Sequence, residues 1–339
     1  MNNETINSAD PDYKKIEMSL RALGLIQSPD PVIVALTGGV SSLIVRIDEG
    51  DRSFCAKSAL NQLKVEADWL VPVHRNQSEV AWMRIAEGLV PGAVPNILGD
   101  DPKQNVFAMQ WLDPDQYPVW KQQLMDGLLS VSFACDVGRV LGKIHSGTAR
   151  DSAMAVQFSN DSDFDALRLD PYLRATAAVH PGSAERLVSL CDVIQQNRRV
   201  LIHGDVSPKN ILQGPEGPVF LDAECATYGD PAFDLAFCLN HLILKAVHLP
   251  EFVDALSDCF YALVDSYLAH VHWETVADVE ARTSALLPAL ALARVDGKSP
   301  VEYLRDDEKA WIRKKAIELV NNPVSQLDAF LKIWKENLN

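Results

Sequence analysis

The sequence lacks long hydrophobic runs and a basic charge excess, and each absence excludes a class of protein. No stretch approaches the roughly 18 uncharged apolar residues of a membrane-spanning helix. The N-terminal residues MNNETINSADPDYKK hold no apolar core of a secretory signal. Acidic residues outnumber basic ones by 46 to 31, which leaves no basic footprint for nucleic acid. We therefore expect a cytoplasmic protein that binds neither membranes nor nucleic acids, and no motif indicates its oligomeric state.

Cysteine-based sites and two common nucleotide motifs are absent as well. The six cysteines are spread along the chain without a CxxC pair, which favours reduced core thiols over a zinc site or a disulfide framework. Neither GxxxxGK[ST] nor GxGxxG occurs, so a P-loop or a dinucleotide-binding fold is disfavoured. Any bound nucleotide must be held by a different arrangement of backbone and charge.

The first third of the chain predicts a small lobe built on an antiparallel sheet. Residues 11–24 predict an amphipathic helix, and residues 32–47 predict a hairpin with a glycine-rich turn. Further elements are predicted at 52–59, 94–99 and 105–112 for strands and at 78–88 for a helix with Ser78 as its N-cap. We place this lobe at residues 1–112, with a linker at 109–112 leading out of it.

The rest of the chain, residues 113–339, predicts a larger and mainly helical lobe. Two acids and two prolines between Asp113 and Pro118 interrupt the preceding pattern. Strong helical periodicity follows at 130–147 and 231–249, and short β-like pieces lie at 199–205, 210–214 and 217–224. A β-rich lobe followed by a larger helical lobe, in a chain too long for one core, predicts a bilobal α+β fold.

Three polar residues of the second lobe have the spacing that phosphoryl transfer requires. In the stretch LIHGDVSPKNILQGPEGPVFLDAE, Asn210 follows Asp205 by five positions, as in the kinase pattern D-x-x-x-x-N, and Asp222 ends the next strand. A loop of this length can direct one carboxylate at a hydroxyl while it returns an amide oxygen to a metal. We predict Asp205 as the catalytic base and Asn210 and Asp222 as Mg²⁺ ligands in the catalytic loop region that begins at residue 203.

The first lobe offers the complementary parts for holding phosphates. Lys57 lies within an apolar strand, where a buried amine needs an anionic partner, and Glu79 on the following helix can supply it. A cation held in this way is available to the phosphates of a nucleotide. The glycine-rich turn adds close backbone approach and hydroxyl donors through Gly38, Gly39, Ser41 and Ser42.

The motifs HGDVSPKN, LDAE and GDPAFDLA together resemble the aminoglycoside phosphotransferase and choline kinase-like superfamily of small-molecule kinases. His-Gly-Asp at 203–205, Asp-Ala-Glu at 222–224 and the lack of an Ala-Pro-Glu segment resemble the small-molecule branch more than protein kinases. The resemblance implies a bilobal protein-kinase-like fold that binds ATP or GTP with Mg²⁺. It also implies that linker residues contact the base and that Asp234 braces the catalytic loop. The linker residues concerned are Met109, Gln110, Trp111 and Leu112.

Three further residues have more than one interpretation. His203 is expected to be a structural residue of the loop. Glu224 is an additional carboxylate that is a metal ligand, a substrate contact or a structural group. Arg294 is either a substrate or phosphate contact, by resemblance to methylthioribose kinases, or one half of a salt bridge at a helix end.

The sequence therefore predicts an ATP-dependent phosphotransferase with a small alcohol as acceptor. The acceptor could be an aminoglycoside, an amino alcohol or a sugar. The residues that bind it are expected after Leu239, where the sequence contains no motif that distinguishes these classes. The alternatives are a nucleotide-binding pseudokinase that acts as a scaffold and, less favoured by the motifs, a protein kinase.

Overall fold

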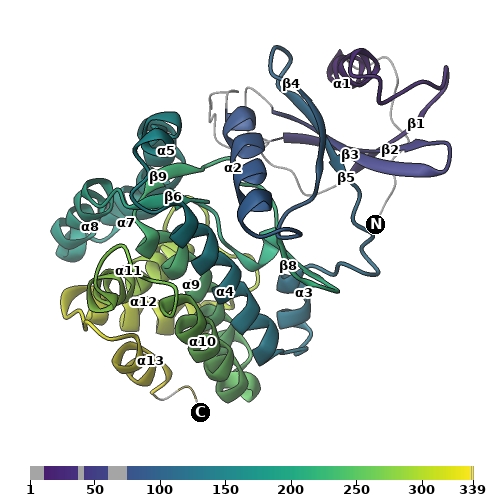
Figure 1. The fold of residues 1–339 in the computed structure, drawn as a ribbon. Helices are drawn as coiled ribbons and strands as arrows, with labels where there is room; N and C mark the ends of the chain where they lie inside the picture. Colours follow the sequence, from purple (N-terminus) through teal and green to yellow (C-terminus); the bar gives the residue numbers. More distant parts are fainter. Residues whose placement is uncertain (1–10, 37–41, 60–74, 337, 339) are drawn as a thin grey trace. The chain divides into compact units, whose positions relative to one another are not determined.

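The protein is described by a computed structural model that covers residues 11–36, 42–59, 75–336 and 338. The chain divides into two compact units, Met1–Pro114 and Asp115–Asn339, so the division falls inside the proline-containing segment (Figure 1). The first unit is a sheet with two helices, and the second is mainly helical with two short β-ladders.

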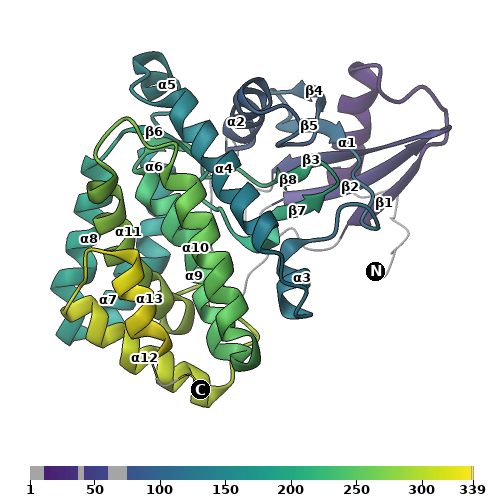
Figure 2. The same ribbon diagram turned by 60° about the horizontal axis from the view of Figure 1, so that its bottom comes forward.

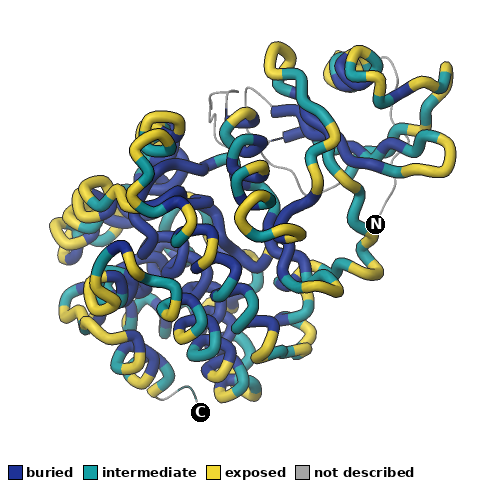
Figure 3. The backbone as a smooth tube through the Cα atoms, viewed as in Figure 1, coloured by how far each residue is buried: buried dark blue, intermediate teal, exposed yellow. Residues whose placement is uncertain are grey.

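The sheet of the first unit has five antiparallel strands in the order β1-β2-β3-β5-β4. Its elements are α1 Pro11–Ala22, β1 Val32–Leu36, β2 Ser42–Glu49, β3 Arg52–Ala59, α2 Arg75–Leu89, β4 Ile97–Asp101 and β5 Val106–Gln110. Strands β1 and β2 form the predicted hairpin, with Val32 opposite Asp48 and Leu36 opposite Ile44. Buried residues concentrate in the inner strands β2, β3 and β5, whereas the edge strands β1 and β4 contain only intermediate and exposed residues (Figure 3).

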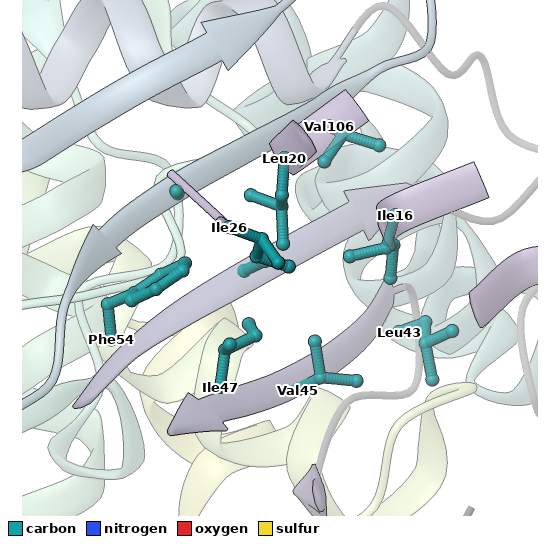
Figure 4. Packing of buried hydrophobic residues seen from close by; sticks show 10 residues of the cluster. Ile16, Leu20, Ile26, Leu43, Val45, Ile47, Phe54 and Val106 are labelled. Atoms are coloured by element: carbon teal, nitrogen blue, oxygen red, sulfur yellow. The ribbon is translucent and has the colours of Figure 1, made fainter. Parts of the chain in front are cut away.

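The two faces of this sheet differ in chemistry, because side chains alternate between them along each strand. Successive side chains of a strand point to opposite faces. Phe54 and Ala56 of β3 therefore share one face, where they join a core with Ile16 and Leu20 of α1 (Figure 4). Lys57 lies on the other face, to which α2 brings its own residues. The alternation thus separates the apolar core from the charged face.

Helix α2 begins at Arg75, so the prediction of a helix that starts at an N-cap Ser78 was wrong. Arg75 and Asn76 are buried in the first turn, with 1% and 3% of their surface exposed. Buried polar residues do not contribute to an apolar repeat, which is why the sequence pattern detects the helix only from its second turn.

The second unit contains eleven α-helices among its described residues, together with a π-helical segment. The α-helices are α3 Trp120–Met125, α4 Val131–Thr148, α5 Ser152–Gln157, α6 Asp161–Phe164, α7 Ala175–Val179, α8 Ala184–Gln196, α9 Pro231–His248, α10 Val253–Leu268, α11 Val276–Asp296, α12 Asp306–Asn321 and, near the end, α13 Leu327–Lys335, and the π-helical segment is Asp165–Arg174. The ladders pair β6 Val200–Ile202 with β9 Thr227–Gly229 and β7 Ile211–Gly214 with β8 Gly217–Phe220.

Helix α9 is the central helix of the second unit. Its residues from Pro231 to Val247 are all buried, and α10 and α11 pack against it. Helix α4 lies alongside α10 (Figure 2), and Gly138 on α4 permits this contact because a Cβ atom there would collide with the backbone carbonyl of Leu263. A helix buried all round supplies a fixed frame for the loops at its N-terminus.

Two expectations from composition can be compared with the described residues. All six cysteines carry free thiols, as predicted. Among the residues that the structure describes, no single helix is both long and apolar enough to cross a membrane. One pair, Pro231–His248 with Pro250–Leu268, reaches the required length and composition only jointly, across a bend of 119°.

Candidate active site

The loop between β6 and β7 carries Asp205, whose carboxylate is held by three side chains, two from this loop and one from the π-helical segment. Oδ2 lies 3.0 Å from Arg168 Nη2 and 3.4 Å from Lys209 Nζ. It also accepts a hydrogen bond of 2.9 Å from Asn210 Nδ2, and the same amide donates to the Asp205 carbonyl over 3.1 Å. The carboxylate is therefore fixed in place, which a positioned base requires.

The charge of Asp205 is maintained by its neighbours. Only 4% of the residue is exposed, and burial alone would raise the pKa of its carboxyl. The cations Lys209 and Arg168 outweigh burial, so the pKa of Asp205 is lower than its usual value. Asp205 is thus ionised at neutral pH and can accept a proton.

His203 takes part in the fold of the loop and has a single tautomer in this arrangement. Its Nε2 donates to the Leu221 carbonyl over 3.0 Å, and its Nδ1 accepts from the Asp205 N–H over 3.1 Å. Burial lowers the pKa of His203, which keeps the ring neutral. These contacts support the structural interpretation of His203.

Asp234, in the first turn of α9, holds the loop backbone from below. Its carboxylate accepts hydrogen bonds from the N–H groups of His203, at 2.7 Å, and Gly204, at 2.8 Å. His145 Nε2 lies 3.2 Å from the same carboxylate, and Asp234 is completely buried. The side chain of Asp234 thereby connects the loop between β6 and β7 to the buried central helix.

Gly204 is required by both backbone conformation and space. Its φ of +79° lies in the left-handed region, and a Cβ atom would lie 2.6 Å from the carbonyl oxygen of Cys225. A larger residue between His203 and Asp205 would therefore displace the loop. The His-Gly-Asp form of the motif follows from this close approach.

Asn210 and Asp222 offer oxygen atoms that fit a magnesium ion. Because Asn210 Nδ2 donates to Asp205, its Oδ1 is the atom left for a metal. Asp222 has a φ of +69°, uncommon for a non-glycine residue, and its charge acts on the pKa of Asp205. Within the described ranges, no group of three or more His, Cys, Asp or Glu side chains could hold a metal ion. A site with two protein ligands nevertheless suits Mg²⁺, which retains waters and substrate phosphate oxygens.

Arg168 is a site residue that the sequence did not indicate. It lies in the π-helical segment, where its Nε donates to the Gly204 carbonyl over 2.6 Å while Nη2 pairs with Asp205. The arginine is buried, so both contacts are shielded from water. No local motif surrounds Arg168, and only the fold brings it to a loop more than thirty residues further along the chain.

In the first unit, Lys57 and Glu79 form a buried ion pair. Lys57 Nζ lies 2.7 Å from Glu79 Oε2 and donates to Oε1 over 2.9 Å. Each residue is only 2% exposed. Burying two charges is costly unless the geometry is good, and the two short contacts between Lys57 and Glu79 supply that geometry.

The other predicted nucleotide contacts are only partly covered by the structure. Gly38, Gly39 and Ser41 lie outside the described residues. Ser42 begins β2 opposite Ala59 and is buried. The first two residues of the predicted linker, Met109 and Gln110, end β5, where Met109 pairs with Cys55 and the Gln110 N–H donates to the Asn96 carbonyl over 2.9 Å. Trp111 and Leu112 follow the strand, and the guanidinium of Arg46 lies 5.0 Å from the Trp111 ring centroid.

Glu224 and Arg294 lie near the loop in different ways. Glu224 contributes, after Cys225, Asp205 and Tyr172, to raising the pKa of Arg168. Arg294, in the last turn of α11, donates through Nη1 to the Ser299 carbonyl over 2.5 Å and to the Tyr172 hydroxyl over 3.2 Å. Arg294 forms no ion pair with a described carboxylate, which argues against the helix-end salt bridge.

Comparison with known proteins gives the family. Residues 32–258 match the sequence profile of the phosphotransferase enzyme family. The chain belongs to this family. It is also 25% identical over 240 residues to a methylthioribose kinase of Bacillus cereus, an alignment that covers 63% of this chain and 60% of the relative.

Two solved structures share the fold of this family member. An ethanolamine kinase of Plasmodium vivax aligns with a TM-score of 0.56 at 12% identity, over 92% of this chain and 95% of that one. An amicoumacin kinase aligns with a TM-score of 0.58 at 12% identity, over 94% and 96% of the two chains. These alignments agree with the predicted protein-kinase-like fold of an antiparallel-sheet lobe and a larger helical lobe.

Proposed function

We propose that the protein transfers the γ-phosphate of ATP to a hydroxyl group of a small molecule. The observation that carries this proposal is the Asp205 carboxylate, ionised and fixed by Arg168 and Asn210 in a loop that Asp234 braces. Phosphoryl transfer depends mainly on such positioning and on charge neutralisation. The family match and the methylthioribose kinase relative support the same reaction class.

In this mechanism Asp205 accepts the proton of the acceptor hydroxyl as its oxygen forms the new bond to the γ-phosphorus and the bond to ADP breaks. Asn210 Oδ1 and the Asp222 carboxylate would hold Mg²⁺, which supplies charge neutralisation on the phosphate oxygens when bound. Lys57, oriented by Glu79, would contact the α- and β-phosphates. Gly38, Gly39, Ser41 and Ser42 would cover the phosphates, and the 109–112 linker would contact the base.

Nucleotide binding and turnover are tested separately. ADP release is measured with Mg²⁺ and either ATP or GTP against aminoglycosides, methylthioribose, choline, ethanolamine and sugars, while nucleotide binding is followed by thermal shift. We expect Asp205→Asn to bind nucleotide normally and to lose about 10²- to 10⁴-fold in kcat. Asp192→Asn, at an exposed position of α8, is the matched control and should retain full activity.

Three outcomes contradict parts of this proposal. Near-normal turnover by Asp205→Asn removes the base assignment. Nucleotide binding without transfer to any small alcohol favours a pseudokinase scaffold. Failure to bind either nucleotide contradicts the phosphotransferase reaction itself.

A further inference from the structure

One face of helix α9 continues the catalytic site away from the loop. Asp234, Phe237, His241 and Lys245 follow one another at intervals of three or four residues, so they lie on the same side of the helix. The first of them braces the catalytic loop. The other three therefore form a wall that leads from the loop along α9.

Contacts between rings and cations join this wall to Asp205. The guanidinium of Arg168, which pairs with Asp205, lies 5.9 Å from the centroid of the Phe237 ring. The Phe237 ring is 5.9 Å from that of His241 and 5.4 Å from that of Tyr172. The wall is thus continuous with the catalytic carboxylate inside one compact unit.

Lys245, at the far end of the wall, is a buried amine without an acceptor. It is completely buried, and its Nζ makes no hydrogen bond to any described residue. The Nζ atom lies over the Tyr303 ring, 5.2 Å from its centroid. The Tyr303 hydroxyl and Arg294 Nε are also buried without a described partner. Unsatisfied buried donors are costly, and a native protein keeps them where they serve a purpose.

The electrostatic surroundings of Lys245 are positive. Burial and, after it, the charges of Lys121 and Arg294 lower the pKa of Lys245 to about 7, against weaker opposing effects of Glu302 and Cys238. Lys121 lies 6.0 Å from the same Tyr303 ring and pairs with Glu302. Burial and then Arg294 and Lys245 lower the pKa of His241 in the same way. Glu302, the carboxylate that raises the pKa of Lys245, is therefore already paired with Lys121.

We propose that the phosphate acceptor carries an anionic group, a carboxylate or a phosphate ester, that binds to Lys245, Tyr303 and Arg294 while its hydroxyl meets Asp205. An anion is an acceptor-only group, and its hydrogen bonds to cationic donors are among the strongest in proteins. It would satisfy the donors that the described residues leave without a partner. This inference rests on the proposed function and narrows the class of its substrate.

Matched pairs of acceptors test the substrate class. The two members of each pair share a carbon skeleton, and one of them carries the anionic group: glycerate with glycerol, gluconate with glucitol, and glucose 6-phosphate with glucose. We expect measurable turnover of an anionic member and at least tenfold lower kcat/KM for its neutral counterpart. The carboxylate and phosphate pairs separate the two possible sources of the charge. Preference for the neutral or a cationic alcohol overturns the inference while it leaves the kinase function intact.

Two substitutions connect the preference to the residues. Lys245→Met removes the charge and keeps the length of the side chain, and Tyr303→Phe removes one hydroxyl without a described partner. Both should raise KM for the anionic acceptor, about tenfold or more for Lys245→Met, with little change in kcat. Lys143→Met, an exposed lysine of α4, is the matched control and should leave KM unchanged. An unchanged KM in both wall variants overturns the assignment.

A binding measurement keeps this test independent of turnover. Inorganic phosphate is titrated calorimetrically into the full chain with AMP-PNP and Mg²⁺ occupying the nucleotide site. We expect binding that weakens at least tenfold in Lys245→Met and is unchanged in Lys143→Met. Lys245-dependent phosphate binding without any phosphotransfer would retain the anion site and reject the kinase function. Binding that is equal in the two variants, or absent from the unmodified protein, would reject the anion site.

Discussion

The two compact units each bury a lysine, and the surroundings of the two amines differ. In the first unit, Lys57 Nζ lies 2.7 Å from the Glu79 carboxylate. In the second, Lys245 Nζ faces the Tyr303 ring and makes no hydrogen bond to a described residue. The charge of Lys57 is therefore fixed by the fold, whereas the charge of Lys245 depends on pH and on what binds to it. Burial alone therefore does not define the role of a lysine. Whether a carboxylate lies beside the buried amine determines whether its charge is retained.

Removing the carboxylate from the paired lysine should have the largest effect. Glu79→Gln leaves the Lys57 charge in a buried position without its carboxylate, which typically costs about 3–5 kcal/mol. We expect urea unfolding to show a loss of this size and ADP release to fall with it. The double variant Lys57→Met/Glu79→Leu should recover most of the stability and none of the activity, since it removes both charges together. Recovered activity would show that the pair only stabilises the sheet.

Replacing Lys245, which has no hydrogen-bond partner among the described residues, should raise the free energy of unfolding instead of lowering it. The pKa of Lys245 falls from 10.5 in the unfolded chain to about 7 in the native protein. Between these pH values the unfolded chain binds more protons, so the free energy of unfolding rises with pH. Lys245→Met removes this cost and should stabilise the protein by about 2–4 kcal/mol at pH 7, after allowing for the lost contact with Tyr303.

The pH dependence decides whether this interpretation is correct. The stability difference between Lys245→Met and the unmodified protein should shrink from pH 7 to pH 10.5 and disappear above it. Urea unfolding at four or five pH values measures it directly. A difference that stays constant over this range would mean that Lys245 is already neutral or paired in the native protein.

Sequence patterns anticipated one of these lysines and not the other. Lys57 was recognised because a charged residue interrupts an apolar strand, and Glu79 because a helix follows. Lys245 lies in a helix that is buried all round. Such a helix has no polar face in its sequence pattern, so the pattern does not show whether a single lysine points to solvent or into the protein. The fold class could be predicted from the order of β-rich and helical segments. The group of Asp205, Asn210 and Asp222 could be predicted because their spacing along the chain is a local property.

Long-range contacts account for what the sequence did not predict. Arg168 reaches Asp205 from a π-helical segment that contains Pro171, and neither the segment nor its contact follows from a local repeat. The start of α2 at Arg75 was missed because its first turn buries polar side chains. Tyr303 and Lys245 are far apart in the sequence, and only the tertiary structure brings the ring and the amine together. In each case the tertiary structure brings together residues whose own neighbours in sequence are unremarkable.

A third buried cation extends the comparison to the catalytic loop. Arg168 and Lys209 hold the pKa of Asp205 below its usual value against the effect of burial. Arg168→Gln should therefore raise this pKa and move the acidic limb of the kcat/KM profile to higher pH by about one unit, equivalent to roughly 1.4 kcal/mol. Arg174→Gln, which alters a partly exposed pair with Asp165 in the same π-helical segment, should leave the limb in place. An unmoved limb in Arg168→Gln would assign the limb to another group.

The smallest effect is expected for a lysine whose pair is exposed. Lys298 Nζ lies 2.9 Å from Asp170 Oδ2, a distance close to that of the Lys57 pair, but the two side chains are 57% and 46% exposed. Water already solvates both charges, so Lys298→Gln should change the free energy of unfolding by less than about 0.5 kcal/mol. The change should vanish in 1 M salt, where screening acts within about 3 Å. A loss comparable to that of Glu79→Gln would mean that pairing distance, and not removal from water, sets the energy of these ion pairs. We expect the change in the free energy of unfolding to be largest for the buried pair, smaller for the unpaired buried amine and smallest for the exposed pair. This order would follow if each lysine's energy depends on how far its charge is removed from water and on whether a carboxylate offsets that loss.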